Sequence, residues 1–228
     1  MSKKKEISSY RLLVVAHPDD ETLFFSAALL NLKNKPWRVV CVTDANADGF
    51  GKKRALQFKK ACKMLGVQAY EQWDFPDIYV QRLDLKKLKE KLLELPTPLE
   101  VYSHGVTGEY GHPHHQDLGY MVSQVFKVPV WAPAYNCAAD KVISLNQKQY
   151  QLKSKIYAEV YGGETLRFSQ FIPNRNADEF YKVSASENQE IYSSIIEKRS
   201  PVKSKLKKYK WFAKFLAEKN KEKVTRPF

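Results

Sequence analysis

The stretch Arg11-Leu-Leu-Val-Val-Ala16, followed at once by His17-Pro-Asp-Asp-Glu21, indicates how the chain begins to fold. The five consecutive apolar residues 12–16 are typical of a strand that is buried on both faces of a sheet. The acidic residues after Pro18 suit the positive end of a helix dipole, so we expect a helix over residues 19–34. A buried strand that leads directly into a helix is the building unit of a parallel α/β sheet.

The same alternation of strand and helix continues to residue 131. Apolar runs predict strands at 37–43, 67–73, 99–103 and 128–131, and helical patterns predict helices at 52–65, 84–95 and 113–126. This order predicts an α/β fold, a mostly parallel, doubly wound sheet with helices on both faces. Beyond residue 141 the alternation fades. There we expect a helix over 148–160, a break at Gly162-Gly163 and irregular structure over 164–185.

The positive charge of the chain is concentrated at its C-terminal end. Of the formal net charge of +13, residues 198–228 carry +10, from twelve Lys or Arg and two Glu. We therefore divide the chain into a nearly neutral domain, residues 1–197, and a basic, helical C-terminal segment, residues 198–228. Leu206, Tyr209 and Leu216 recur in this segment at helical spacing. We expect them to pack on the domain; the alternative is peripheral contact with an anionic membrane or an acidic partner.

The composition also argues against several classes of protein. No apolar run approaches the ~18–20 residues that cross a bilayer, and no signal peptide is evident, so we expect a cytoplasmic protein. Cys41, Cys62 and Cys137 are odd in number and widely spaced, which disfavours a disulfide framework and a thiolate zinc site. Because residues 1–197 are nearly neutral, we expect no nucleic acid as a partner.

A first polar cluster stands where the first strand meets its helix. His17 and Asp20 are three residues apart, so both side chains can turn toward one point as the helix begins. Imidazole nitrogen and carboxylate oxygen are suitable ligands for zinc or a similar divalent ion. Asp19 points elsewhere, and can take a proton from bound water without binding the metal. The alternative is that the acidic residues only complement the helix dipole.

A second cluster, Gly108-Glu-Tyr-Gly-His112-Pro-His-His115-Gln-Asp117, follows the predicted fourth strand. His112 and His115 repeat the spacing and context of the first cluster. One can supply a third ligand, and the other can face the substrate, where a protonated imidazole would stabilise a developing oxyanion. His104, at the end of the same strand, is interpreted as a hydrogen-bonded structural residue.

The two clusters together favour a catalytic metal over an incidental one. In open α/β sheets, ligands bind beyond the carboxyl ends of the strands, where both clusters are expected. Three nitrogen or oxygen ligands and an open position are typical of catalytic zinc. The sequence therefore predicts a metal-dependent hydrolase, in which a metal-activated water is the nucleophile.

These residues resemble the PIG-L/LmbE-like family of zinc-dependent N-acetylglucosaminyl deacetylases. The resemblance covers residues 10–135 and rests on Ala16-His-Pro-Asp-Asp-Glu21, on His112-Pro-His-His115, and on the helix that carries Arg54 and ends in Leu65-Gly-Val67. Phe75-Pro-Asp77 resembles the segment that follows the third strand in the family. The resemblance implies a Rossmann-like fold and a hydrolase that removes an acetyl group from an N-acetylglucosamine-type sugar.

The resemblance also implies roles for individual residues. The zinc ligands would be His17, Asp20 and His115, the general base Asp19, and the oxyanion-stabilising group His112. Arg54 and Asp77 would contact sugar hydroxyls. An amidase of the same type, acting on another amide or sugar conjugate, is the alternative. A membrane- or nucleic-acid-binding protein with a vestigial site is a third reading, disfavoured by the two intact clusters.

Three positions depart from the family pattern. His114 stands where many members carry Asp, and the loss of that carboxylate is expected to lower the pKa of His112. Gln57 replaces a common Glu, and Phe24-Phe25-Ser26 occupies a stretch that is often rich in glycine. None of these changes removes a proposed ligand or the base, so they bear on the substrate more than on the chemistry.

Overall fold

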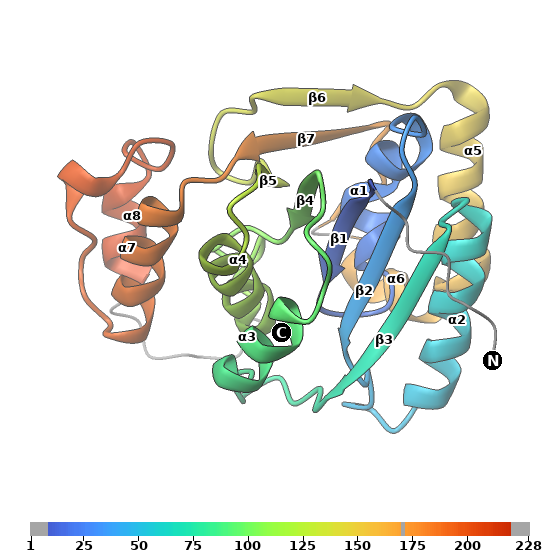
Figure 1. Cartoon of the computed structure of the whole chain (residues 1–228), viewed down its shortest axis with the longest axis horizontal. Coiled ribbons are helices and arrows are strands. Elements are labelled where there is room, and N and C mark those ends of the chain that lie inside the picture. Colours follow the sequence, from blue (N-terminus) through green and yellow to red (C-terminus); the bar gives the residue numbers. More distant parts are fainter. Residues whose placement is uncertain (1–8, 170–171, 220–228) are drawn as a thin grey trace.

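One mixed sheet forms the centre of the computed structural model, which describes residues 9–169 and 172–219. Among these residues the sheet has seven strands in the order β3-β2-β1-β4-β5-β7-β6 (Figure 1). The strands are β1 (Arg11–Val15), β2 (Trp37–Thr43), β3 (Ala69–Phe75), β4 (Glu100–Ser103), β5 (Val130–Pro133), β6 (Lys141–Ser144) and β7 (Ala177–Lys182). The first five are parallel to one another, and β7 runs antiparallel to both β5 and β6.

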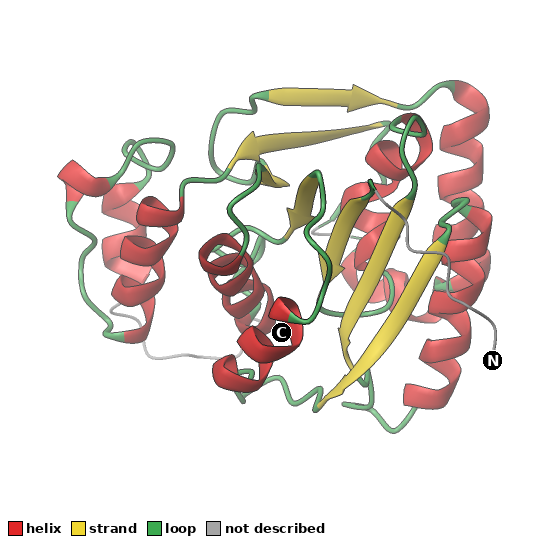
Figure 2. Ribbon diagram, in the orientation of Figure 1, coloured by secondary structure: helices red, strands yellow, loops and turns green. Residues whose placement is uncertain are grey.

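Helices connect these strands and flank the sheet (Figure 2). They are α1 (Asp20–Asn31), α2 (Gly51–Met64), α3 (Leu85–Leu93), α4 (Pro113–Val125), α5 (Gln147–Lys155), α6 (Gly162–Phe168), α7 (Ala185–Ile196) and α8 (Ala213–Lys219). A π-helical turn (Ile156–Val160) extends α5, and a 3-10 turn covers Lys203–Lys205. The strands and helices expected before residue 131 are confirmed, with shifts of a few residues at their ends.

Alternate residues of β1 face opposite sides of the sheet, which explains its unbroken apolar sequence. Leu13 and Val15 join a buried cluster that includes side chains of α1 and α2, whereas Leu12 and Val14 join one formed with α3 and α4. All four side chains are fully buried, and each stabilises the fold by roughly 1.5–3 kcal/mol. The predicted doubly wound, Rossmann-like sheet with helices on both faces is confirmed.

The expectation of irregular structure over 164–185 is wrong. Gly162-Gly163 begins α6 instead of breaking a helix, and β7 lies within the predicted irregular stretch. The strand escaped prediction because charged residues interrupt its apolar pattern. One of them, Asp178, is buried, and it accepts a hydrogen bond from the backbone N–H of Ala27 at 2.6 Å and pairs with Lys153 at 3.4 Å. Because a charged residue of this ion pair stands at a buried position, the strand lacks the alternation of apolar and polar residues by which strands are recognised in a sequence.

The basic C-terminal segment packs on the rest of the chain as far as residue 219. Leu206, Tyr209 and Leu216 are buried in a cluster with Tyr181 of β7 and Ile191 of α7. The favoured packing interpretation is therefore confirmed for these side chains, and residues 220–228 lie outside the described part. Among the described residues, the helical parts of the segment are a 3-10 turn and the short α8.

Two glutamates of α7 hold this segment in position. The carboxylate of Glu187 accepts hydrogen bonds from the backbone N–H groups of residues 207–209, at 2.8–3.2 Å. Glu190, one turn further along, pairs with Arg199 and Lys205 and accepts the N–H of Val202. Arg199 and Lys205 of the segment are thus paired with an acid of the chain itself, and Figure 1 shows α7 and α8 as neighbours.

Across 9–169 and 172–219, no helix combines the length and the apolar character needed to cross a membrane.

Candidate metal centre

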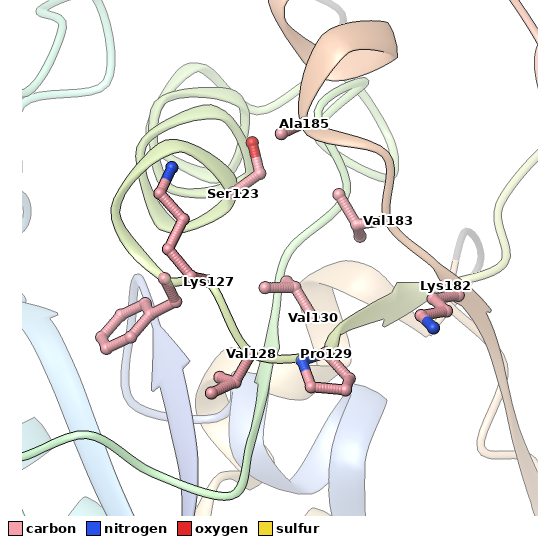
Figure 3. Close-up of a pocket in the computed structure, with 9 residues that line it drawn as sticks. Ser123, Lys127, Val128, Pro129, Val130, Lys182, Val183 and Ala185 are labelled. Carbon is pink, nitrogen blue, oxygen red and sulfur yellow. The ribbon is translucent and has the colours of Figure 1, made fainter.

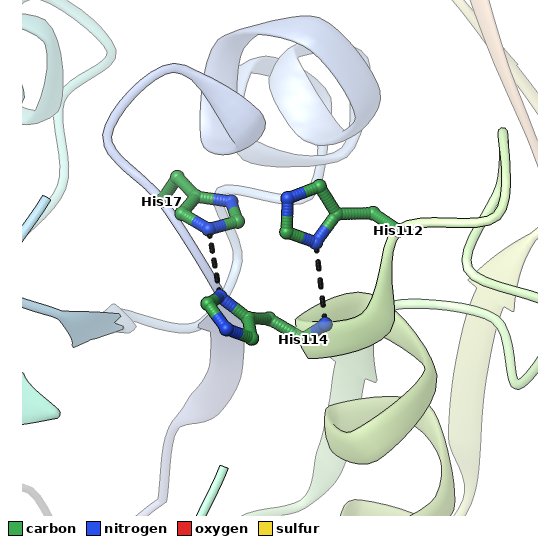
Figure 4. Close-up of side chains that lie close together, drawn as sticks. All are labelled: His17, His112 and His114. Carbon is green, nitrogen blue, oxygen red and sulfur yellow. Dashed lines mark hydrogen bonds between the residues drawn. The ribbon is translucent and has the colours of Figure 1, made fainter. Parts of the chain in front are cut away.

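The two histidine clusters meet beyond the carboxyl ends of β1 and β4, which are neighbours in the sheet. His17 follows β1 directly, whereas His112 caps the start of α4 and His115 lies in its first turn. The rings of His17 and His112 are 4.6 Å apart, although the residues are 95 positions apart in the sequence. Figure 4 shows His17 facing His112 and His114 across the gap between the two segments. The predicted convergence is confirmed.

His17, Asp20 and His115 bring three donor atoms together in one buried triangle. His17 Nδ1 lies 3.5 Å from Asp20 Oδ2 and 3.3 Å from His115 Nε2, and the latter two atoms are 3.5 Å apart. Ligands at about 2.0–2.1 Å from a tetrahedral zinc ion are separated by about 3.3–3.4 Å. The donor types and their spacing therefore fit three corners of a zinc site, with a fourth position left for water or substrate.

The electrostatics of this triangle also favour a cation. Burial lowers the pKa of His17, but hydrogen bonds to Asp20 and Asp77 outweigh it and raise the pKa to about 10. The two carboxylates lie against opposite nitrogens of the ring, at 3.5 and 3.3 Å. In the absence of a metal, a proton on His17 therefore supplies the positive charge that a divalent ion would supply at this site.

Asp19 stands beside the triangle in a strained conformation. Its φ is 119°, outside the range that side-chain-bearing residues ordinarily adopt, and such strain is concentrated at functional sites. The carboxylate is buried, and Oδ2 lies 3.4 Å from the Arg54 guanidinium. Burial and the charge of Asp20 raise the pKa of Asp19 well above its usual value, while Arg54 opposes the shift.

His112 offers a single ring nitrogen to the site. Its Nδ1 accepts a hydrogen bond from the backbone N–H of His114 at 3.2 Å, so in the neutral ring the proton is on Nε2. Burial, followed by the nearby His17 and His115 and only then His114, lowers the pKa of His112. The structure therefore favours a neutral N–H donor over the protonated imidazole expected from the sequence.

Arg54 and Asp77 lie at the site but face the metal ligands. The guanidinium of Arg54 donates to the backbone oxygen of Pro18 at 3.0 Å and contacts Asp19. Asp77 Oδ1 is 3.3 Å from His17 Nε2, and its Oδ2 is 3.6 Å from Arg54. Burial raises the pKa of Asp77, but His17, His114 and Arg54 together lower it. Asp77 thus orients His17, and a contact with sugar hydroxyls stays a prediction.

Glu109 is a functional residue that the sequence reasoning missed. Its buried carboxylate accepts hydrogen bonds from His115 Nδ1 at 2.7 Å, His104 Nδ1 at 3.0 Å and the backbone N–H of Gly105 at 2.7 Å. The bond to His115 places that ring's proton on Nδ1 and leaves Nε2 free to bind metal. The available signal was its position in the sequence, an acid between two glycines in the stretch that leads into His112.

The remaining polar residues of the clusters support the ligands. His104 Nε2 accepts a hydrogen bond from the backbone N–H of Ala16 at 3.1 Å, which agrees with its structural interpretation. His114 donates through Nε2 to backbone oxygens of the segment after β3 and turns Nδ1 toward His17. Gln57 donates to the backbone oxygen of Val160, away from the ligands. The ring of Phe24 packs edge-on against His115.

A separate pocket of about 350 Å³ lies between α4, β5 and the start of α7 (Figure 3). Apolar side chains such as Val130 and Val183 line it, together with Lys127 and Lys182. Lys127 donates to the backbone oxygen of Gln124 at the end of its own helix. None of the predicted site residues lines this pocket, and the metal centre remains the site with the required chemistry.

Comparisons with known proteins relate the chain to a family of deacetylases. The family described as GlcNAc-PI de-N-acetylase, PIG-L, matches residues 12–126. An uncharacterized protein of Acanthamoeba polyphaga mimivirus is 26% identical over an alignment of 185 positions that covers 64% of this chain and 79% of that protein. The N-acetylglucosaminyl-phosphatidylinositol de-N-acetylase of Bos taurus is 30% identical over an alignment of 125 positions that covers 48% of this chain and 47% of the bovine enzyme. The chain thus spans about half of the bovine protein.

A solved structure shares the fold. The N,N'-diacetylchitobiose deacetylase of Pyrococcus horikoshii aligns with a TM-score of 0.59 over 78% of this chain and 85% of its own, at 14% identity. The family match covers slightly more than half of the 228 residues and contains every predicted site residue from His17 to His115. The chain therefore belongs to the PIG-L/LmbE-like family of metal-dependent deacetylases.

Proposed function

We propose that the protein removes the acetyl group from an N-acetylglucosamine-type sugar, with one zinc ion per chain as its cofactor. The observation that supports this most directly is the triangle of His17, Asp20 and His115, whose donor atoms lie 3.3–3.5 Å apart. Beside it stand an acid for proton transfer, Asp19, and an N–H donor, His112. These are the groups that hydrolysis of an amide requires.

His17 Nδ1, Asp20 Oδ2 and His115 Nε2 would hold the zinc ion. When bound, the ion would act as a Lewis acid that polarises the acetyl carbonyl and lowers the pKa of water. The chain's own groups do the rest. Asp77 and Glu109 hold the outer nitrogens of His17 and His115, so that the inner nitrogens stay unprotonated and point to the centre.

Asp19 is the proposed general base. As the water oxygen attacks the acetyl carbon, the carboxylate takes one proton from that water, and its raised pKa suits it for the transfer. The Nε2–H of His112 donates to the oxygen that becomes negative. The C–N bond then breaks, and the proton passes to the amine nitrogen. The immediate products are acetic acid and the amino sugar; the acid then passes its proton to the amine, giving acetate and the ammonium form of the sugar, so that atoms and charge balance.

Two features support a sugar as the substrate. The Nε atom of Arg54 is buried and has no hydrogen-bond partner among the described residues, so its N–H is available to a sugar hydroxyl. The rings of Tyr79 and Tyr110 lie 5.0 and 6.0 Å from that of His112, and aromatic walls of this kind are common in ligand sites. The bovine relative is an N-acetylglucosaminyl-phosphatidylinositol de-N-acetylase and the Pyrococcus horikoshii neighbour an N,N'-diacetylchitobiose deacetylase, whereas other structural neighbours deacetylate teicoplanin and the A40926 pseudoaglycone.

The alternative is an amidase of the same type that acts on another amide or sugar conjugate. The metal centre serves both equally, because the same water attack cleaves any amide that reaches it. Acetate release should therefore be measured over a panel of free, nucleotide-linked, lipid-linked and polymeric N-acetylated sugars. Acetate released from none of them, by an enzyme carrying its full zinc, would favour the amidase.

Two variants test the assigned roles. Asp19→Ala should keep its zinc and lose at least 100-fold in acetate release, since general base catalysis contributes about 10²–10⁴-fold. His115→Ala should lose the ion held by the triangle, so that elemental analysis after dialysis finds one zinc ion per chain fewer than in wild type. Near-normal turnover of Asp19→Ala with full metal would rule out the base, and unchanged zinc in His115→Ala would rule out that ligand.

Peripheral contact of residues 198–228 with an anionic membrane or an acidic partner stays a separate prediction. It is supported by the exposure of Trp211 and Phe215, 69% and 54%, among the lysines of the segment. The full chain and a Trp211→Ala variant should be compared in sedimentation with vesicles that contain anionic lipid. Equal sedimentation of both would remove this aromatic residue from the contact.

A further inference from the structure

A second group of donor atoms faces the outer nitrogen of His17. Its Nε2 atom lies 3.2 Å from Nδ1 of His114 and 3.3 Å from Oδ1 of Asp77, and these two atoms are 3.7 Å apart. The triangle has nearly the dimensions of the first one, and the two share the ring of His17. Donor atoms of His112 and His114 also fall within 4.8 Å of one another and of His17, but both nitrogens of His112 already have partners or roles at the first site.

The hydrogen bonds of this group leave one acceptor unsatisfied. His114 donates through Nε2 to the backbone oxygen of Gln81 at 2.9 Å, which fixes its ring and presents Nδ1 as a lone pair. The Asp77 carboxylate is also an acceptor. His17 Nε2 has a single proton, and both acceptors compete for it at nearly equal distance. Buried acceptors in excess over donors are a setting in which a cation stabilises the group.

We propose that His17 Nε2, His114 Nδ1 and Asp77 Oδ1 form a second site for zinc or a similar divalent cation. Two imidazoles and a carboxylate are the ligand types that zinc prefers. The hydrogen bond from His114 to Gln81 holds the ligand nitrogen in place, as hydrogen bonds to a ligating histidine do in established zinc sites. The proposal concerns binding alone, and holds whichever amide the enzyme cleaves.

The two ions would bind opposite nitrogens of one imidazole. A cation at Nε2 takes the place of the proton that His17 donates there, and that proton leaves to solvent. With both ions present, His17 bridges them. The second ion also occupies Asp77, so zinc above the level that fills the first site should compete with any substrate group that contacts this carboxylate.

All five histidines of the chain lie at this centre, which makes ion counting informative. The full chain should be dialysed against increasing zinc and its bound metal measured by elemental analysis. Wild type should reach two ions per chain, whereas His114→Leu and Asp77→Asn should saturate at one. Asp48→Asn is the matched control, because Asp48 lies on the neighbouring loop, where it pairs with Arg167 at 3.8 Å, and it should retain two.

His115→Ala separates this proposal from the proposed function. It should lose the first ion and keep one at the second site. If it keeps both, the first ligand set is wrong while the second site stands. Wild type that saturates at one ion, or a folded His114→Leu or Asp77→Asn that still binds two, overturns the second site. Asp77→Asn preserves the size of the side chain, so it decides the question should the leucine variant fail to fold.

Discussion

Replacing Glu109 by glutamine should weaken metal binding although Glu109 is not one of the three proposed zinc ligands. Its carboxylate accepts three hydrogen bonds, the shortest side-chain one from His115 Nδ1 at 2.7 Å. These bonds to His104 and His115 outweigh burial and hold the pKa of Glu109 at about 2, so the group is ionised. Glutamine has nearly the same shape but only one acceptor oxygen, and its NH₂ group faces a histidine N–H. The repulsion favours the His115 tautomer that carries its proton on the ligand nitrogen, Nε2.

The size of the effect follows from the lost bond. A hydrogen bond to a charged group stabilises by about 1.5–3 kcal/mol, and every 1.4 kcal/mol corresponds to about tenfold in an equilibrium constant. We therefore expect the zinc Kd of Glu109→Gln to rise by about 10- to 100-fold, which matches the usual cost of losing a partner of a metal-bound histidine. The enzyme should regain activity at high zinc, because no ligand or base has been removed.

Zinc affinity can be measured by competition with a chromophoric chelator at fixed pH. Glu179→Gln makes the same chemical change at an exposed position of β7 and should leave the Kd unaltered. Thermal unfolding of the metal-free proteins shows whether the fold survives the change. A Kd for Glu109→Gln within twofold of wild type, in a folded protein, would refute the argument that Glu109 sets the tautomer of His115.

Further predictions concern the fold around the site and the C-terminal segment. Gly108 has φ +74°, and a Cβ there would stand 2.6 Å from the backbone oxygen of His112. Gly108→Ala should therefore lower the free energy of unfolding in urea by about 1–3 kcal/mol and reduce turnover. A variant with the wild-type stability and turnover would contradict this. Glu187→Ala removes the acceptor of the N–H groups of residues 207–209, so trypsin should cleave this stretch faster than in wild type, and equal rates would count against it. Hydrogen bonds outweigh burial and lower the pKa of Glu190 to about 2, so its contribution, on the order of 1–3 kcal/mol, is present above about pH 4.5 and is lost as the pH falls toward 2. Wild type and Glu190→Gln should therefore differ most in urea unfolding at pH 7, differ less at pH 3 and converge only as the pH reaches about 2; a constant difference would reject the pairing.

The first half of the fold was predictable because its signals are local. Five apolar residues in a row, 12–16, must be buried on both faces, and the acids that follow mark the start of a helix. The later strands lack that signal. In β7 the buried Asp178 is balanced by Lys153 and by a backbone N–H of α1, contacts that exist only after folding. A strand stabilised by a distant partner leaves no periodicity in its own sequence.

The site shows the same division between what is local and what is distant. The motif spacing predicts that His17, Asp20 and His115 lie together. His17 and Asp20 are one helical turn apart, and His115 follows the strand next to the one that His17 follows. It does not show which nitrogen of each ring faces the centre. Glu109 decides this for His115 from a loop with positive φ, and no spacing rule places its carboxylate between two histidines.

The orientation of Asp77 illustrates why ligand identity is easier to predict than ligand geometry. The resemblance assigns this residue to the substrate, yet in the fold its Oδ1 lies against His17 and its Oδ2 toward Arg54. A carboxylate in this position fixes the proton of the proposed ligand His17 on Nε2, and so influences metal binding. Only the lone pairs that this hydrogen bond leaves free can accept hydrogen bonds from a substrate. His114 strengthens this bias, since it competes for the same N–H of His17 and leaves the aspartate oxygen open to another positive group. The departure from the family pattern at position 114 therefore changes the outer side of His17, a proposed zinc ligand, more than it changes His112, and we expect it to affect metal binding before it affects the choice of substrate.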